Sequence, residues 1–297
     1  QTCALPILPH LAALFVSVLD NCNPSKFVRF YVIDDDIDFE SKQLLRFSVK
    51  NARMNSDVEF LKINKEFFTN VVISDRIPET AYYRIAIPEL FRGTEVERIL
   101  YMDCDMIALQ DISKLWRLDF GDSIVAAVED AGFHQRLEKM EISAKSTRYF
   151  NSGLMLINVK KWLDENITQK VLDFIEHNPE KLRFHDQDAL NAILHDRWLP
   201  LHPRWNAQGY IMAKAKKHPT AAGEREYEET RNNPYIIHFS GHVKPWSKDF
   251  EGPTKKYYEK YAGMTAFRCV AKFPKYPKYA KVQPKTDVVV KIGRAHV

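Results

Sequence analysis

The sequence contains few cysteines and no long apolar run. Only four of its 297 residues are cysteine, and Cys22, Cys104 and Cys269 stand far apart once the first seven residues are set aside. An odd number at wide spacing argues against a disulfide framework and favours a reducing compartment. No apolar run approaches the ~20 residues that span a bilayer. Internal repeats and low-complexity tracts are also absent, so a globular protein is predicted.

The two ends of the chain differ in character from the rest. Residues 1–7 (QTCALPI) and 291–297 (KIGRAHV) can be translated back into complementary DNA strings. This predicts that both segments are translated sequencing adapter and that the native protein was cut short at both ends. Such segments are excluded from reasoning about the fold.

The remaining chain alternates between apolar strands and amphipathic helices, which predicts an α/β class with a mostly parallel sheet covered by helices on both faces. The polar stretch Lys214–Asn233 matches neither an apolar strand nor an amphipathic helix and is predicted to be a surface loop or lid. The expected strands are 27–36, 58–63, 98–103, 123–130, 154–159 and 235–240. The expected helices are 8–21, 39–51, 80–91, 160–177 and 188–195.

The stretch RILYMDCDMIA (98–108) resembles a buried strand that ends in two carboxylates. In an open α/β sheet, ligands bind outside the carboxyl ends of the strands, where water and a ligand can reach such groups. If the chain remains extended, Asp103 and Asp105 share a face and Cys104 points away. Two hard oxygen ligands suit a divalent cation that also binds phosphate oxygens. Acid-X-acid is common in turns, so an ordinary turn is the alternative.

Three further clusters carry polar groups next to expected elements. FNSGLMLIN places Asn151 and Gly153 just before a strand, and HDQDALNAIL places Asp186 and Gln187 at the start of a helix. The alternative for the second cluster is helix capping by Asp186 or Asp188. HFSGHVKPW follows a strand with a set typical of metal and phosphate contacts: His238, Gly241 and Lys244, with Trp246 more typical of packing.

Together these motifs resemble glycosyltransferase family 8, retaining nucleotide-sugar transferases of the GT-A fold. The matching segments follow the family's order and cover about residues 8–250. They are YYRI (82–85), LYMDCDM (100–106), FNSGLMLINVKKW (150–162), HDQDALN (185–191) and HFSGHVKPW (238–246). The resemblance implies a Rossmann-like GT-A domain over 8–252, followed by an extension over 253–290. It also implies that the family's first strand, which carries an acid for the nucleoside, is missing here.

The resemblance also assigns roles to residues. Asp103, Asp105 and His238 would bind the metal; an imidazole beside two carboxylates favours Mn²⁺ over Mg²⁺. Gly241 and Lys244 would hold the diphosphate. Arg84, Asn151, Asp186 and Gln187 would hold the donor sugar, with Asp103 also reaching its hydroxyls, although Arg84 could instead form an ion pair on a helix face. Gln187 and Asp186 would lie next to the reacting carbon.

The implied reaction moves galactose or glucose from a UDP-sugar to a glycan or glycolipid, such as lipopolysaccharide, with retained anomeric configuration. The acceptor is expected to contact the loops 130–149 and 210–233. Two other readings remain open: a non-catalytic sugar-nucleotide- or glycan-binding module, and a nucleotide-sugar hydrolase.

Charge is concentrated near the C-terminus. Residues 255–285 carry a net charge of +8, interleaved with aromatic side chains, in a chain whose total is +4. This segment suits an anionic membrane surface, where each Lys or Arg contributes roughly 1 kcal/mol; a solvated tail is the alternative. No base-stacking or groove-reading motif accompanies it, which disfavours nucleic acid. The expected location is the cytoplasm, at the inner face of the membrane.

Overall fold

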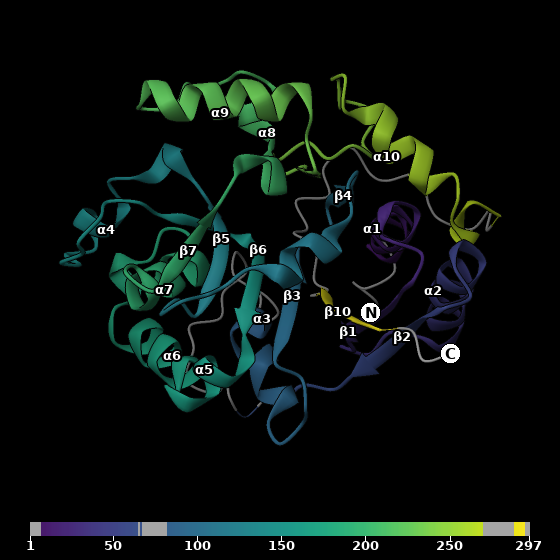
Figure 1. Cartoon of the computed structure of the whole chain (residues 1–297), viewed down its shortest axis with the longest axis horizontal. Coiled ribbons are helices and arrows are strands. Elements are labelled where there is room, and N and C mark those ends of the chain that lie inside the picture. The colour runs from purple at the N-terminus through teal and green to yellow at the C-terminus, as the bar shows by residue number, and fades with distance from the viewer. Residues whose placement is uncertain (1–6, 65, 67–81, 270–287, 295–297) are drawn as a thin grey trace. The chain divides into compact units, whose positions relative to one another are not determined.

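The computed structural model describes residues 7–64, 66, 82–269 and 288–294. The chain divides into two compact units, and each is described by itself. Unit 1 comprises Gln1–Phe60, Asp103–Arg117 and Pro203–Val297, and unit 2 comprises Leu61–Met102 and Leu118–His202. Figure 1 labels their helices and strands.

In unit 1, strands β2, β1 and β10 are neighbours in that order, and β10 runs antiparallel to β1. A second, three-stranded sheet has the order β4-β9-β8. The strands are β1 Lys26–Ile33, β2 Ser56–Leu61, β4 Met106–Ala108, β8 Ala207–Gln208, β9 Ile236–His238 and β10 Val288–Arg294. The helices are α1 Leu8–Asn21, α2 Phe39–Ala52, α8 Gly209–Met212, α9 Ala221–Asn232 and α10 Lys255–Ala262.

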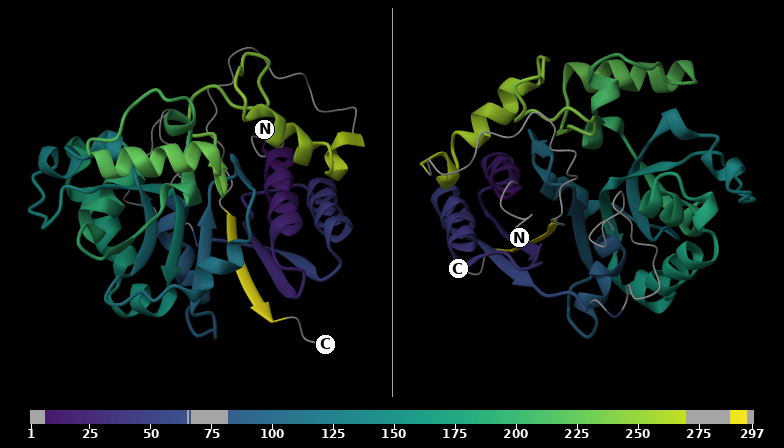
Figure 2. Two further views of the ribbon diagram at one scale, coloured as in Figure 1. Left: turned by 45° about the horizontal axis from the view of Figure 1, so that its top comes forward. Right: turned by 180° about the vertical axis from the view of Figure 1, so that it is seen from behind.

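Helix α1 is the central helix of unit 1. Its residues Leu8 to Leu19 are buried apart from Pro9, because α2, α10 and β4 all pack against it (Figure 2). Such a helix is apolar nearly all round, as a buried helix must be. Helix α2 buries only one face, and its N-cap Asp38 accepts a hydrogen bond from the Ser41 amide at 2.8 Å. The predicted helices 8–21 and 39–51 are confirmed.

In unit 2, strands β3, β6, β5 and β7 are neighbours in that order. The strands are β3 Arg98–Met102, β5 Val125–Glu129, β6 Phe150–Asn158 and β7 Trp198–Leu201. The helices are α3 Tyr83–Ala86, α4 Arg136–Lys139, α5 Val159–Asp164, α6 Ile167–His177 and α7 His185–Leu194.

The α/β class is confirmed, but the sheet is mixed rather than mostly parallel. Strand β6 runs antiparallel to both β3 and β5, whereas β5 runs parallel to β7. Eight of the nine residues of β6 are buried. A strand covered on both faces reads as a continuous apolar run whichever way its neighbours point, so its direction could not be inferred from the pattern.

Several predicted boundaries were wrong. Lys214–Asn233 is not a loop, because its second half forms α9, a polar helix that buries Gly223, Tyr227 and Thr230. The helix expected over 160–177 is two helices, α5 and α6, separated by Asn166 in the left-handed conformation (φ 53°). The helix expected over 80–91 is α3 followed by a 3₁₀ turn, Ile87–Phe91. Residues 80 and 81 lie outside the described residues.

The structure describes only part of the segments predicted at the two ends of the chain. Of the extension 253–290, α10, the 3₁₀ turn Ala266–Cys269 and the first three residues of β10 lie in unit 1. The rest of β10 is residues 291–294, which were predicted to be adapter. Residues 270–287 lie outside the described range, as do 1–6 and 295–297. Cys22 and Cys104 are buried, and neither forms a disulfide bond within the described part of the chain. Within the described residues, no helix is both long enough and apolar enough to span a bilayer.

Candidate functional site

Asp103, Asp105 and His238 converge in unit 1. Their candidate ligand atoms all lie within 4.8 Å of one another. His238 Nε2 is 3.6 Å from Asp103 Oδ2 and 3.4 Å from Asp105 Oδ1. His238 and Asp105 are buried, and Asp103 is partly exposed. The predicted three ligands are therefore brought together.

The register of β4 and β9 explains this convergence. The two strands run antiparallel with Met106 opposite His238, and the Phe239 amide donates to the Asp105 carbonyl at 3.0 Å. Two strands that are far apart in the sequence therefore lie side by side. The strand β3 ends at Met102, and Cys104 and Asp105 form a turn rather than an extended continuation. The two carboxylates meet His238 through this turn.

Asn206 orients the imidazole and was missed by the sequence analysis. Its Oδ1 lies 2.9 Å from His238 Nδ1, and its side chain is fully buried. Asn206 immediately precedes β8, which pairs parallel with β9 and places Gln208 opposite His238. A hydrogen bond from Nδ1–H to Asn206 leaves the Nε2 lone pair facing the carboxylates, as metal-binding histidines require. No local signal in the sequence marks Asn206.

The residues present fit a divalent cation. Asp105 Oδ1 is buried and, among the described residues, accepts no hydrogen bond. A buried carboxylate oxygen in this state is unfavourable unless a cation occupies its lone pairs. Two carboxylates and one imidazole are ligands that Mn²⁺ and similar ions accept.

Lys244 is a positive group in direct contact with this cluster. Its Nζ lies 2.5 Å from Asp105 Oδ2 and donates to the Phe239 carbonyl at 2.8 Å. Burial alone would raise the pKa of Asp105, but the positive charge of Lys244 holds that pKa below its usual range. Asp105 is therefore ionised at neutral pH.

The loop that carries Lys244 is fixed by aromatic packing. The rings of Trp246 and His10 stack with centroids 3.7 Å apart and an interplanar angle of 7°. His10 Nδ1 is 2.5 Å from the Tyr258 hydroxyl oxygen. The packing role predicted for Trp246 is thus consistent with its surroundings, whereas His10 on α1 was not singled out from the sequence.

Replacing His10 by Phe should reduce the fall in the free energy of unfolding that occurs as the pH drops. Burial lowers the pKa of His10 from 6.5 to about 3. Between these values the unfolded chain binds a proton that the folded chain does not, so wild-type stability falls as the pH drops through this window. Phenylalanine keeps an aromatic ring but has no proton to bind. Urea unfolding at several pH values measures this dependence.

The control is His177→Gln, at an exposed position, which should leave the dependence of the unfolding free energy on pH as in the wild type. An equally steep dependence in His10→Phe would contradict the role given to His10.

Unit 2 gathers the predicted sugar-binding residues around the start of α7. Arg84 Nε is 3.2 Å from Asp186 Oδ2, and its NH1 lies 3.3 Å from the Ser152 hydroxyl. The Gln187 side-chain oxygen accepts hydrogen bonds from the Asn151 side chain at 3.2 Å and from the Ser152 amide at 3.1 Å. The ion pair of Arg84 is thus with α7 and not along its own helix. Arg84, Asn151, Asp186 and Gln187 form one network.

Two features of this network were not predicted. Asn151 and Gly153 lie inside β6 rather than before it, because the strand begins at Phe150. Asp130, which directly follows β5, joins the network: its Oδ2 is 3.4 Å from Asn151 Nδ2 and 3.5 Å from Gln187 Nε2. The acid at the end of SIVAAVED was a possible signal for it.

Asp188 determines how α7 begins. The alternative role for Asp186 or Asp188, as a side-chain N-cap, is wrong, because the cap position is Phe184. Asp188 instead lies inside the first turn, and its Oδ2 accepts the amides of Arg183 and Phe184, both at 2.7 Å. Its side chain is fully buried and also pairs with Arg136. This carboxylate holds in place the turn that carries Asp186 and Gln187.

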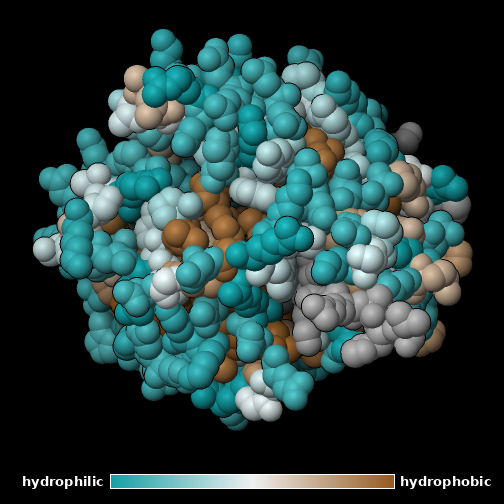
Figure 3. Space-filling view, viewed as in Figure 1, coloured by the Kyte–Doolittle hydropathy of each residue, from teal (hydrophilic) through white to brown (hydrophobic). Residues whose placement is uncertain are grey.

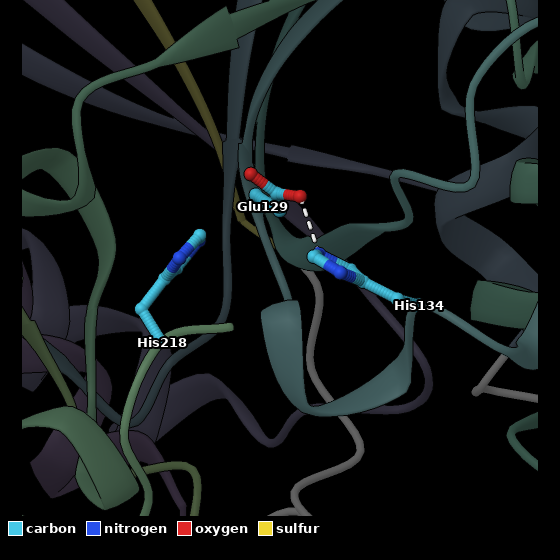
Figure 4. Close-up of side chains that lie close together, drawn as sticks. All are labelled: Glu129, His134 and His218. Atoms are coloured by element: carbon cyan, nitrogen blue, oxygen red, sulfur yellow. Dashed lines mark ion pairs between the residues drawn. The ribbon is translucent and has the colours of Figure 1, made fainter. Parts of the chain in front are cut away.

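A second acidic group of unit 2 lies at the end of β5. Glu129 pairs with His134 at 2.5 Å (Figure 4) and with Arg148 at 2.8 Å. Burial would raise the pKa of Glu129, but hydrogen bonds from His134 and Arg148 lower it to about 2. His218, also drawn in Figure 4, belongs to unit 1. We assign this ion pair a structural role within unit 2.

The sequence of this chain is similar to those of known proteins. General stress protein A of Bacillus subtilis is 44% identical over 263 residues, covering 88% of this chain and 91% of that protein. The lipopolysaccharide 1,2-glucosyltransferase of Escherichia coli K12 is 29% identical over 180 residues, covering 60% of this chain and 52% of that enzyme. The chain therefore spans about half the length of the second relative.

Among solved structures, the fold is similar to that of the galactosyltransferase LgtC in complex with donor and acceptor sugar analogs. The TM-score is 0.74 at 23% identity, covering 91% of this chain and 95% of that one. The sequence profile of Glycosyl transferase family 8 matches residues 7–249. The chain belongs to this family and is a glycosyltransferase with a GT-A fold.

Proposed function

We propose that this chain transfers a hexose, galactose or glucose, from a UDP-sugar to a glycan acceptor, with Mn²⁺ as cofactor and with retained configuration. The convergence of Asp103, Asp105 and His238 around a buried carboxylate oxygen is the observation that carries the proposal. Relatives named lipopolysaccharide 1,2-glucosyltransferase and lipopolysaccharide 1,3-galactosyltransferase support hexose transfer to a cell-surface glycan.

The residues of unit 1 would bind the diphosphate. A divalent ion held by Asp103, Asp105 and His238 would offset the charge that develops on the departing UDP. Lys244 would add a second positive charge by exchanging part of its contact with Asp105 for a phosphate oxygen. Gly241 would let the backbone approach the diphosphate closely.

The residues of unit 2 would bind the sugar. Arg84, Asn151, Asp186 and Gln187 offer donors and acceptors for hydroxyl groups, and Asp103 is a further candidate. Gln187 is proposed to lie next to the reacting carbon. Its amide is a poor nucleophile and its oxygen is already hydrogen-bonded, which favours attack by the acceptor on the face that the diphosphate leaves. A covalent sugar adduct trapped on Asp186 or Gln187 would contradict this mechanism.

Gly241→Ala should separate a binding role from a folding role. A Cβ built at Gly241 meets no atom within 4 Å, and its φ is not in the left-handed region. Thermal stability should therefore be unchanged. If the diphosphate approaches this backbone, the methyl group should weaken UDP-sugar binding about tenfold or more, as overpacking of a close contact does. Titration calorimetry with the UDP-sugar measures this; unchanged affinity would remove Gly241 from the site.

A screen of UDP-hexoses tests the function. UDP release and product mass are followed with lipopolysaccharide core oligosaccharides as acceptors, with EDTA and after addition of Mn²⁺ or Mg²⁺. We expect one preferred hexose, loss of activity in EDTA, and better recovery with Mn²⁺. Activity that EDTA leaves unchanged would contradict the metal site. Free hexose as the sole product would indicate a hydrolase, and UDP-sugar binding without turnover would indicate a binding module.

An anionic membrane surface is the second proposed partner. The basic helix α10 and the residues that follow it to 285 would contact acidic lipid headgroups at the inner face of the membrane. This partner suits a glycolipid acceptor, since it keeps the enzyme where the acceptor is anchored.

A further inference from the structure

The outer face of α2 carries the most exposed hydrophobic side chains of unit 1. Phe39 is 75% exposed, Phe47 is 64% exposed, and Met54, just past the helix end, is 77% exposed. These three belong to the five large hydrophobic residues that are exposed among the described residues. At the right edge of Figure 3, where Figure 1 places α2, hydrophobic side chains reach the surface. This concentration on one element calls for an explanation.

Helical geometry places the two phenylalanines on the same face as basic residues. Positions 39, 43, 46, 47 and 50 fall within one sector of a helix with 3.6 residues per turn. They are Phe39, Gln43, Arg46, Phe47 and Lys50, so the strip contains two cations and no acid; Glu40 flanks it. The opposite face of α2 is buried and holds Ser41, Leu45, Ser48 and Val49.

Both basic side chains of the strip lie at the surface and contact neighbouring groups. Arg46 lies 4.9 Å above the ring of Phe60. Lys50 donates to the carbonyl groups of Met54 and Ser56 at the end of the helix. These contacts hold both basic groups beside the exposed apolar side chains. A helix with large apolar side chains among basic residues is typical of segments that lie in the interface of anionic membranes.

Helix α2 is also part of the same unit as the basic helix α10. Both pack against α1, as Figure 2 shows, and the Ala266 amide after α10 donates to the Ser48 hydroxyl at 2.9 Å. Lys256 and Lys260 are exposed on α10. The basic extension and the aromatic face are thus carried by neighbouring helices.

We propose that the outer face of α2 docks on an anionic lipid bilayer, with Phe39, Phe47 and Met54 entering the headgroup region and Arg46 and Lys50 beside lipid phosphates. This deepens the proposed membrane partner and rests on it. A second copy of the chain fits this face less well, because a twofold contact would bring Arg46 and Lys50 against the same cations of the other copy.

Co-sedimentation with vesicles tests the proposal. Vesicles of phosphatidylglycerol and phosphatidylethanolamine are compared with vesicles of phosphatidylcholine. We expect the wild-type chain to bind the anionic vesicles preferentially. Phe39→Ser with Phe47→Ser should weaken this binding about tenfold or more, and Arg46→Gln about fivefold. Melting temperature and turnover with a water-soluble acceptor should remain at the wild-type level, because all three residues are exposed.

Lys160→Gln is the matched control for charge. Its side chain is 78% exposed in unit 2, and its ammonium pairs with Asp164 four residues along the helix, so vesicle binding should not change. Wild-type binding by the double phenylalanine variant, or equal binding to neutral vesicles, would overturn the proposal. So would a dimer in light scattering that the phenylalanine variant converts to monomer. Vesicle binding is measured without a sugar donor, so its failure is distinct from failure of the transferase reaction.

Discussion

Asp105→Asn should abolish Mn²⁺ binding and UDP release together. The substitution keeps the shape of the side chain but removes the charge of a proposed metal ligand, whose Oδ1 is buried and accepts no hydrogen bond from the described residues. Loss of a residue that merely orients a metal ligand costs 10–100-fold in affinity or activity, so loss of a ligand should cost about 100-fold or more. Titration calorimetry with Mn²⁺ measures this without requiring turnover.

The control is Asp36→Asn. Asp36 is also an acid that follows a strand, but its side chain is exposed. Its φ of 59° lies in the left-handed region, which Asn tolerates. Its replacement should leave Mn²⁺ affinity unchanged. Wild-type affinity and full activity in Asp105→Asn would remove the central role proposed for this carboxylate.

Arg136→Met should lower the free energy of unfolding by about 3–5 kcal/mol, because it leaves the buried Asp188 carboxylate without its cation. Arg136 Nε and NH2 lie 3.0 and 2.6 Å from the two Asp188 oxygens, and both side chains are buried. The Tyr149 hydroxyl and two backbone amides also bond Asp188, but they supply no full positive charge. Urea unfolding measures the loss.

The exposed pair Lys160–Asp164 provides the comparison. Its side chains are 78% and 57% exposed, so Lys160→Met should change the free energy by less than about 1 kcal/mol. Adding Asp188→Asn to Arg136→Met should cost less than the sum of the two single changes, because the uncompensated charge is then gone. Equal losses of unfolding free energy in Arg136→Met and Lys160→Met would show that the buried pair stabilises the fold no more than the exposed pair does.

The sequence alone identified most of the elements and the chemistry of the candidate site. Strands β1, β3, β5 and β9 and helices α1, α2 and α7 lie close to their predicted ranges, because side-chain periodicity is a local property. The residues Asp103, Asp105 and His238 were recognisable for a related reason: each stands at the end of an apolar strand, within a motif of fixed spacing. Their convergence depends on the turn at Cys104 and Asp105 and on the antiparallel pairing of β4 with β9, which the sequence did not specify.

Tertiary structure decided the features that depend on distant partners. Asn206 orients His238, Asp130 joins Gln187, and His10 stacks on Trp246, yet none of these pairs is close in sequence. Likewise α9 is polar along most of its length and forms a helix whose few buried residues include Tyr227. Strand direction in β6 depended on neighbours that an apolar run does not specify. The sequence therefore indicated which groups are proposed to do the chemistry. Packing determined which groups hold them, because such a contact depends on a neighbour in three dimensions and leaves no periodic pattern in the chain.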